Sequence, residues 1–207
     1  AVATVENGTV AAVGSGTAII TAAVGELTAS CQVEVVTLGG QLYAFNFGTD
    51  MSTANAWITM DVNQPQSAKL LADAMAIPNG VTAAAYVDGS VYAFDSAGAF
   101  YELDAETFQG RLLKPADNTT AVTAMAFNYA DGFLYALSYD GNSSFALCQV
   151  NLYTGELRPV MESLEMMYGT PLGGMAIDYE GRFYFMNLDA SGALRLDSFK
   201  LTYDGWM

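Results

Sequence analysis

Leu42-Tyr43-Ala44-Phe45 is the first of four copies of one short apolar strand in this chain. The other copies are Val91-Tyr92-Ala93-Phe94, Leu134-Tyr135-Ala136-Leu137 and Phe183-Tyr184-Phe185-Met186, and successive copies start 49, 43 and 49 residues apart. The copies do not alternate apolar with polar residues, which is typical of strands whose sheet is covered on both faces. A repeat of this period indicates an architecture built from stacked supersecondary units.

Further strands recur around each copy in a fixed order. Strands of small residues that end in turns precede the last three copies, at Val81–Tyr86, Val122–Phe127 and Leu172–Ile177. Alternating strands follow the copies at Met60–Asn63, Tyr101–Asp104, Cys148–Asn151 and Phe199–Thr202, and a last strand closes three units at Ala68–Leu71, Arg111–Leu113 and Leu157–Val160. Four antiparallel strands per unit predict β-propeller blades, and the small residues favour the innermost position for the first strand.

These blades also resemble a known group of repeats. The segments "LYAFNF" (42–47), "YELDAETFQGRLL" (101–113) and "CQVNLYTGELRPV" (148–160) resemble blades of the quinoprotein-like and YVTN-like propellers, and the resemblance covers residues 41–207. It implies the fold and no particular activity, because propellers serve many functions. About three and a half blades do not close a ring of the common size, roughly six to eight blades. We expect a fragment of a larger propeller; the alternatives are a small ring closed by borrowed strands such as Ser30–Val36, or association of chains.

Residues 1–37 have a different pattern. Val2 to Val10 alternate apolar and polar residues about Asn7-Gly8, a strong hairpin signal, and later segments at Thr17–Ala22 and Thr28–Val35 predict further short antiparallel strands. "VATVENGTVAAVGSGTAIITAAVGELTASCQVEV" (2–35) resembles the C-terminal half of a group 2 bacterial immunoglobulin-like domain, without the first half of that module. The resemblance implies a secreted or surface-displayed bacterial protein. The predicted fold is therefore all-β, with a partial immunoglobulin-like sandwich at 1–37 and propeller blades at 38–207.

Composition excludes several classes of function. Seven Lys and Arg against 22 Asp and Glu give a net charge of −15, which argues against a nucleic-acid partner because phosphate binding needs clustered cations. The absence of histidine removes the usual catalytic triads and histidine-ligated zinc sites. No segment predicts a membrane-spanning helix, so we expect no membrane insertion. Cys31 and Cys148 are expected to be buried free thiols.

The loops that follow the repeated tetrapeptides are the candidate binding site, because loops of varying length on a constant scaffold often carry function. The predicted ligand-binding residues are Asp50, Trp57, Asp95, Asp140, Asn142 and Asp189. The carboxylates and the amide would hydrogen-bond sugar hydroxyls, and Trp57 would stack on a sugar ring. The alternative is that these polar residues are ordinary turn formers.

No catalytic residue, metal ligand or cofactor is predicted. Four glutamates, Glu102, Glu106, Glu162 and Glu165, could form carboxylate pairs for glycoside chemistry, but their positions favour solvated charges. We therefore expect an extracellular or cell-surface, non-enzymatic module that binds a glycan or a protein through the propeller loops. The alternatives are part of a glycan-active hydrolase or lyase, and a structural spacer.

Overall fold

Every regular element in the part of the chain that the computed structural model describes is a β-strand. The described residues are 1–35, 40–46, 56–139, 144–161, 170–189 and 191–201. They divide into two compact units, residues 1–43 with 59–69 and residues 44–58 with 70–207. The predicted boundary after residue 37 lies outside the described residues.

The N-terminal residues form two hairpins. Strands β1 (Ala3–Glu6) and β2 (Thr9–Ala12) pair through Asn7 and Gly8, whose φ values of 50° and 79° are those of the predicted tight turn. Strands β3 (Gly16–Val24) and β4 (Leu27–Val35) pair along their whole length. No residue of 1–35 is buried, and Ile19 is 70% exposed. The predicted strands are present, whereas the packed core of a sandwich is not formed by these residues.

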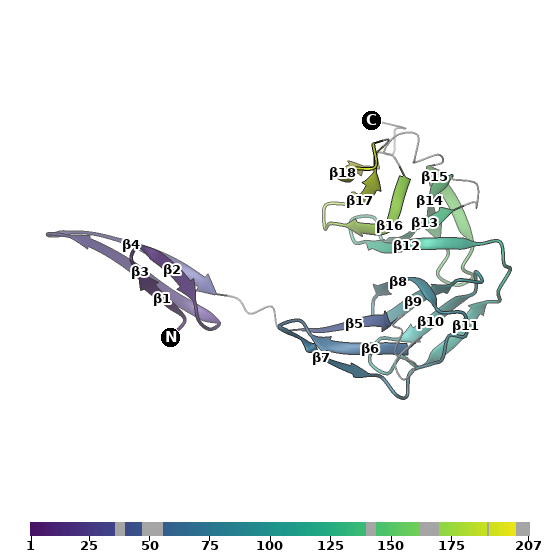
Figure 1. Ribbon diagram of the computed structural model, residues 1–207, viewed down its shortest axis with the longest axis horizontal. Helices are drawn as coiled ribbons and strands as arrows, with labels where there is room; N and C mark the ends of the chain where they lie inside the picture. The colour runs from purple at the N-terminus through teal and green to yellow at the C-terminus, as the bar shows by residue number, and fades with distance from the viewer. Residues whose placement is uncertain (36–39, 47–55, 140–143, 162–169, 190, 202–207) are drawn as a thin grey trace. The chain divides into compact units, whose positions relative to one another are not determined.

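The remaining strands form four antiparallel sheets (Figure 1). The first contains β5 (Gln41–Asn46), β6 (Ala56–Asp61) and β7 (Gln64–Leu70). The second contains β8 (Val81–Val87), β9 (Ser90–Asp95), β10 (Phe100–Asp104) and β11 (Gly110–Lys114). The third contains β12 (Ala121–Asn128), β13 (Phe133–Tyr139), β14 (Phe145–Val150) and β15 (Leu157–Met161), and the fourth contains β16 (Thr170–Ile177), β17 (Arg182–Leu188) and β18 (Leu194–Lys200). The predicted propeller blades are confirmed.

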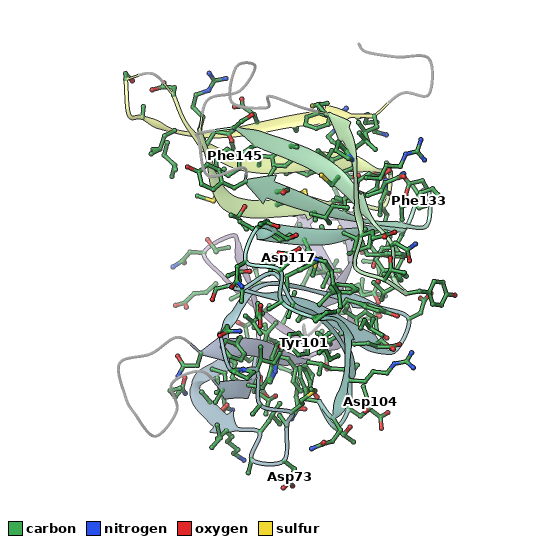
Figure 2. All side chains as sticks on the ribbon, turned by 90° about the vertical axis from the view of Figure 1, so that its right-hand side faces the viewer. Asp73, Tyr101, Asp104, Asp117, Phe133 and Phe145 are labelled. Carbon is green, nitrogen blue, oxygen red and sulfur yellow. The ribbon has the colours of Figure 1, made fainter. Side chains whose placement is uncertain are left out.

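The repeated tetrapeptides form the second strand of each four-stranded sheet and supply the core between sheets. Successive side chains of a strand point to opposite faces, so Tyr92 and Phe94 pack against the third sheet, while Val91 and Ala93 pack toward Trp57 of the first. Strand β12 lies beside both β8 and β16, as expected for the innermost strands of neighbouring blades. Figure 2 places Tyr101 among these packed sheets.

Two predicted strands were misplaced along the sequence. The alternating strand expected at Met60–Asn63 is β6, which ends at Asp61, because the Asp61 carboxylate accepts the backbone N–H of Asn63 and forms a turn there. The strand expected at Phe199–Thr202 is β18, which starts at Leu194. Both cysteines are free thiols; Cys148 is buried as expected, and Cys31 is exposed because the hairpin that carries it has no covering layer.

Candidate functional site

A cleft of about 700 Å³ lies along the second and third blades. Its volume is within the range of small-molecule sites, roughly 300 to 1,000 Å³. The lining residues include Lys114, Thr120, Phe133, Gln149, Glu156 and Arg158, and more of the lining surface is apolar than polar. These residues come from the end of β11, the segment before β12, the start of β13, and the β14–β15 hairpin. The site is therefore assembled from two blades, and no local motif contains it.

Phe133 is the aromatic residue of the cleft. Its side chain is 44% exposed, and Figure 2 places it at the margin of the sheets. Arg158 and Glu156 are exposed as well, whereas Gln149 is half-buried and donates from Nε2 to the Tyr135 hydroxyl at 3.3 Å. An exposed ring beside groups that both donate and accept hydrogen bonds can contact an apolar face and a hydroxyl of the same ligand.

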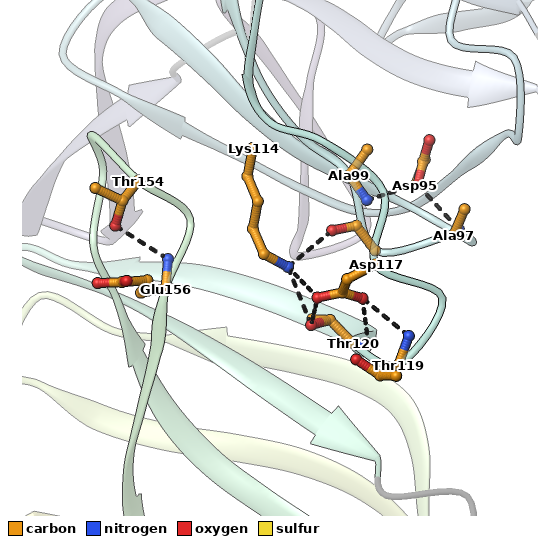
Figure 3. A network of polar contacts seen from close by, with 10 residues as sticks. Asp95, Ala97, Ala99, Lys114, Asp117, Thr119, Thr120, Thr154 and Glu156 are labelled. Atoms are coloured by element: carbon orange, nitrogen blue, oxygen red, sulfur yellow. Dashed lines mark hydrogen bonds and ion pairs between the residues drawn. The ribbon is translucent and has the colours of Figure 1, made fainter.

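Lys114 anchors one wall of the cleft through three hydrogen bonds (Figure 3). Its ammonium donates to the Gly98 carbonyl at 3.1 Å, to the Thr120 hydroxyl at 3.1 Å and to the Asp117 carboxylate. Because an ammonium has three N–H groups, these partners use its full donor capacity. Lys114 therefore holds the segment before β12 in place.

Asp117 is the centre of that segment. Its Oδ1 accepts the backbone N–H groups of Thr119 and Thr120 at 2.9 and 2.8 Å, and its Oδ2 accepts the Thr120 hydroxyl at 2.6 Å. Burial alone would raise the pKa of this carboxyl, but the Lys114 ammonium and the bonds from Thr120 and Thr119 outweigh it and hold the pKa below its usual value. The Asp117 carboxylate therefore stays charged over the ordinary pH range.

The predicted loop residues Asp95 and Asp189 occupy equivalent turns between the second and third strands of their blades. Oδ1 of each accepts the backbone N–H groups two and four residues further on, at 2.9 and 2.9 Å for Asp95 and at 2.8 and 3.0 Å for Asp189. Gly98 and Gly192 take the left-handed conformation in these turns, with φ of 80° and 79°. This geometry supports the turn-forming alternative for both aspartates.

The two aspartates differ in burial. Asp95 is fully buried, and its Oδ2 also accepts the Tyr101 hydroxyl and the Asn79 amide, both at 3.1 Å. Asp189 is partly exposed, and bonds from the Ser191 hydroxyl and the Ala193 N–H lower its pKa. Asp95 has its hydrogen-bonding capacity committed to protein, so a ligand would have to displace an existing partner.

Trp57 lies in the core between the first and second sheets. Its indole is 4% exposed and contacts Phe45 and Phe108 with ring centroids 5.2 and 4.8 Å apart. Its Nε1 is buried without a hydrogen-bond partner among the described residues. This packing supports a core role, and stacking of Trp57 on a sugar stays a prediction.

The other predicted site residues, Asp50, Asp140 and Asn142, lie outside the described residues, as do Glu162 and Glu165. Of the predicted residues that the structure describes, none lines the cleft. The residues that do were missed because strand and turn patterns do not reveal which segments of neighbouring blades meet. The sequence contains one local indication of the cleft, the apolar residue Phe133 directly after the Asp131-Gly132 turn. It indicates only one of the segments that line the cleft. Among the described residues, no three His, Cys, Asp or Glu side chains are grouped as a metal would require, and no helix could cross a membrane.

Comparisons with known proteins give similarity in fold only. No family model matches this chain, and no curated protein matches it. Among solved structures, TolB from Acinetobacter baumannii is similar with a TM-score of 0.47 and 11% identity over 69% of this chain and 34% of TolB. An oligogalacturonate lyase from Vibrio parahaemolyticus is similar with a TM-score of 0.44 and 10% identity over 90% of this chain and 60% of the lyase. The chain thus spans less than two thirds of either protein, and both have β-propeller folds.

Proposed function

We propose that this chain is a non-enzymatic binding module that holds a carbohydrate in the cleft lined by Phe133, Gln149 and Arg158. The observation that carries the proposal is the combination, in one cleft, of an exposed aromatic ring with side chains that donate and accept hydrogen bonds. Sugars present both hydroxyls and apolar C–H faces, so a site of this mixed character suits them. A protein ligand is the alternative partner.

The charge of the cleft supports a neutral or weakly acidic glycan. The whole chain has a net charge of −15, but the cleft contains two of the seven cationic side chains, Lys114 and Arg158, beside the carboxylate of Glu156. Because Lys114 is committed to Asp117, Arg158 is the cation that a ligand would meet.

An enzyme is the second candidate, as part of a glycan-active hydrolase or lyase. Most glycoside hydrolases need two carboxyl groups on either side of the bond they cleave, roughly 5 to 10 Å apart. Glu156 is the one carboxylate in the described lining of the cleft. Glu102, a candidate from the sequence, accepts hydrogen bonds from Tyr92 and Arg111. These observations favour binding over hydrolysis.

We further propose an extracellular or cell-surface location, on the basis of the immunoglobulin-like pattern of residues 2–35. The large exposed fractions of Ile19, Val24 and Leu27, which are 70%, 81% and 79%, suit strands that another sheet covers in a complete sandwich. The module would then be displayed beside an immunoglobulin-like domain.

A glycan-array screen of the soluble chain, with calcium and then with a chelator, tests the binding proposal. We expect specific binding that Phe133→Ala weakens roughly tenfold, the loss of one aromatic contact, and that Arg158→Ala also weakens. Leu112→Ala is the matched control, because Leu112 is 49% exposed on the neighbouring strand β11 and is not a lining residue.

Other results would assign the site differently. Binding that is lost in Asp140→Ala but kept in Phe133→Ala would place the site in the predicted loops. Cleavage products from a bound glycan that disappear in Glu156→Gln would favour the enzyme. No binding across a broad array would contradict the carbohydrate proposal and favour a protein ligand or a spacer.

A further inference from the structure

Two exposed tyrosine rings contact each other at the turns of neighbouring blades. Tyr129 lies in the turn between β12 and β13, and Tyr179 lies in the turn between β16 and β17. They are 50% and 82% exposed, and their ring centroids are 5.5 Å apart at an interplanar angle of 39°. The ring of Tyr129 also meets Phe127 edge to face, with centroids 4.9 Å apart. We call Tyr129 and Tyr179 the tyrosine pair.

The fold brings these two turns together. Strand β12 lies between β8 and β16, the innermost strands of the neighbouring blades (Figure 1). A Cβ added at Gly181, at the end of the turn after β16, would lie 3.1 Å from the Cβ of Ala130 and 3.3 Å from Oδ1 of Asn128. Ala130 and Asn128 belong to the segment that carries Tyr129. The tyrosine pair therefore lies across the boundary between the third and fourth blades.

Two carboxylates flank the tyrosine pair. Glu180 directly follows Tyr179, and Asp88 lies in the turn after β8, on the side of the second blade. Burial raises the pKa of Tyr129, and two neighbouring tyrosine hydroxyls and the carboxylate of Asp88 raise it further. Asp88 is therefore close enough to act on the tyrosine pair from one side, while Glu180 lies on the other.

The charges of these two carboxylates are not neutralised locally. Asp88 and Glu180 are both exposed, and neither forms an ion pair with a residue that the structure describes. The other acidic side chains of the same turns are engaged, since Asp131 and Asp178 each accept a tyrosine hydroxyl, at 2.8 and 3.0 Å. The negative charge of Asp88 and Glu180 is thus available to a ligand on the tyrosine pair.

We propose that the tyrosine pair, together with Asp88 and Glu180, binds a basic peptide segment of a partner protein. An arginine side chain of the peptide lies on the rings, and its neighbouring cationic groups face the carboxylates. The faces of aromatic rings attract cations, and the planar guanidinium both stacks on rings and pairs with carboxylates. None of these residues is among the lining of the cleft, so this inference is independent of the carbohydrate proposal.

Charge and spacing select this ligand among those that stack on tyrosine. A neutral sugar also stacks on exposed rings, but it gains nothing from two carboxylates without cationic partners. Asp88, Tyr129 and Glu180 lie on three successive blades, so an extended ligand with several cations matches them better than one small cation. The net charge of −15 attracts a basic partner at long range, and salt should weaken that attraction.

Fluorescence anisotropy of a labelled hexa-arginine peptide with the full chain tests the contact. We expect Tyr179→Ala to weaken binding about two- to fivefold, the contribution of one exposed cation–π contact. Tyr179→Phe should keep most of the affinity, because the ring remains. Tyr153→Ala is the matched control, because Tyr153 is 84% exposed in another turn of the third blade. Equal affinities of Tyr179→Ala and the unmodified chain, or no binding of the peptide, would overturn the proposal.

A second pair of variants separates this site from general attraction between a basic peptide and an acidic protein. Asp88→Asn and Glu26→Gln each remove one negative charge, but Glu26 lies in the exposed turn between β3 and β4. Asparagine suits the left-handed φ of 45° at position 88, so the turn is kept. We expect Asp88→Asn to weaken binding about two- to fivefold and Glu26→Gln to leave it unchanged. Equal losses would show that net charge alone attracts the peptide, and the proposal would be wrong.

Two further measurements distinguish the peptide site from misfolding and from a second sugar site. Far-UV circular dichroism and the thermal midpoint of Tyr179→Ala should match those of the unmodified chain, since Tyr179 is 82% exposed. Glycan binding, where the array detects it, should be the same for Tyr179→Ala and the unmodified chain. If Tyr179→Ala instead loses glycan binding and keeps peptide binding, the tyrosine pair is a sugar platform and the peptide proposal is wrong.

Discussion

The second and third blades build the same turn between their outer strands from different residues. The Oδ1 atoms of Asp104 and Asn151 each accept two backbone N–H groups of the turn. The backbone carbonyl of each residue also accepts the N–H of the residue four positions further along the chain, at 2.8 Å. That fourth residue is Phe108 in one turn and Gly155 in the other. Both are left-handed, with φ of 55° and 67°.

The difference shows which force decides the residue at this position. Glycine adopts the left-handed conformation without cost, and Phe100 packs against Gly155 so closely that a Cβ there would lie 2.7 Å from the ring. In the second blade the same position faces the core around Trp57, and the fully buried ring of Phe108 fills it. Burial of a large ring thus outweighs an unfavourable backbone conformation that costs about 1 to 2 kcal/mol.

Truncation of Phe108 gives the largest expected effect on this comparison. Phe108→Ala should lower the free energy of unfolding by about 3 to 5 kcal/mol, because it leaves a cavity beside Trp57. Phe108→Gly should be less harmful than Phe108→Ala by about 1 kcal/mol, since glycine relieves the left-handed strain. Urea denaturation measures both. If the Phe108→Ala variant is instead more stable than the Phe108→Gly variant, the backbone at residue 108 is not strained.

A substitution at Gly155 tests the same turn from the other side. Gly155→Ala should cost about 2 to 4 kcal/mol, from the left-handed backbone and from the collision with Phe100. Gly132→Ala is the matched control, because Gly132 has φ of 78° and no atom within 4 Å of its added Cβ. Its cost should be only the backbone part, about 1 to 2 kcal/mol. Equal midpoints of urea unfolding for the two variants would contradict the close packing of Phe100.

These turns also separate what can be predicted from the sequence from what cannot. The repeat, the strand order and turns such as Asn7-Gly8 follow from local patterns, and the structure confirms them. The left-handed Phe108 has no local signal, because propensity disfavours it and only packing between blades selects it. The same holds for the candidate site: aspartates in turns are visible in the sequence, but the burial of Asp95 and the cleft beside Phe133 depend on contacts between distant segments.

The smallest expected effect extends the comparison to the turns of Asp95 and Asp189, which share a backbone geometry but accept hydrogen bonds from different side chains. Only Asp95 accepts a tyrosine hydroxyl, that of Tyr101. Burial, followed by the negative charge of Asp95 and the hydrogen bond to it, raises the pKa of Tyr101 from 10.0 to about 12. The folded chain holds this proton more tightly than the unfolded chain, so the stabilisation is complete below pH 10 and is lost as the pH rises through about 12.

Tyr101→Phe should therefore lower stability by about 1 to 2 kcal/mol at neutral pH, the loss of one hydrogen bond to a charged group. The difference in the free energy of unfolding between the variant and the unmodified chain should decrease above pH 10, because ionisation of Tyr101 destabilises only the unmodified chain. Urea midpoints measured at several pH values check this, with Tyr153→Phe as control, since Tyr153 is 84% exposed. A difference in stability that does not change with pH would mean that the Asp95 carboxylate does not stabilise the protonated Tyr101 hydroxyl. The tyrosine would then not distinguish the energetics of the Asp95 turn from those of the Asp189 turn.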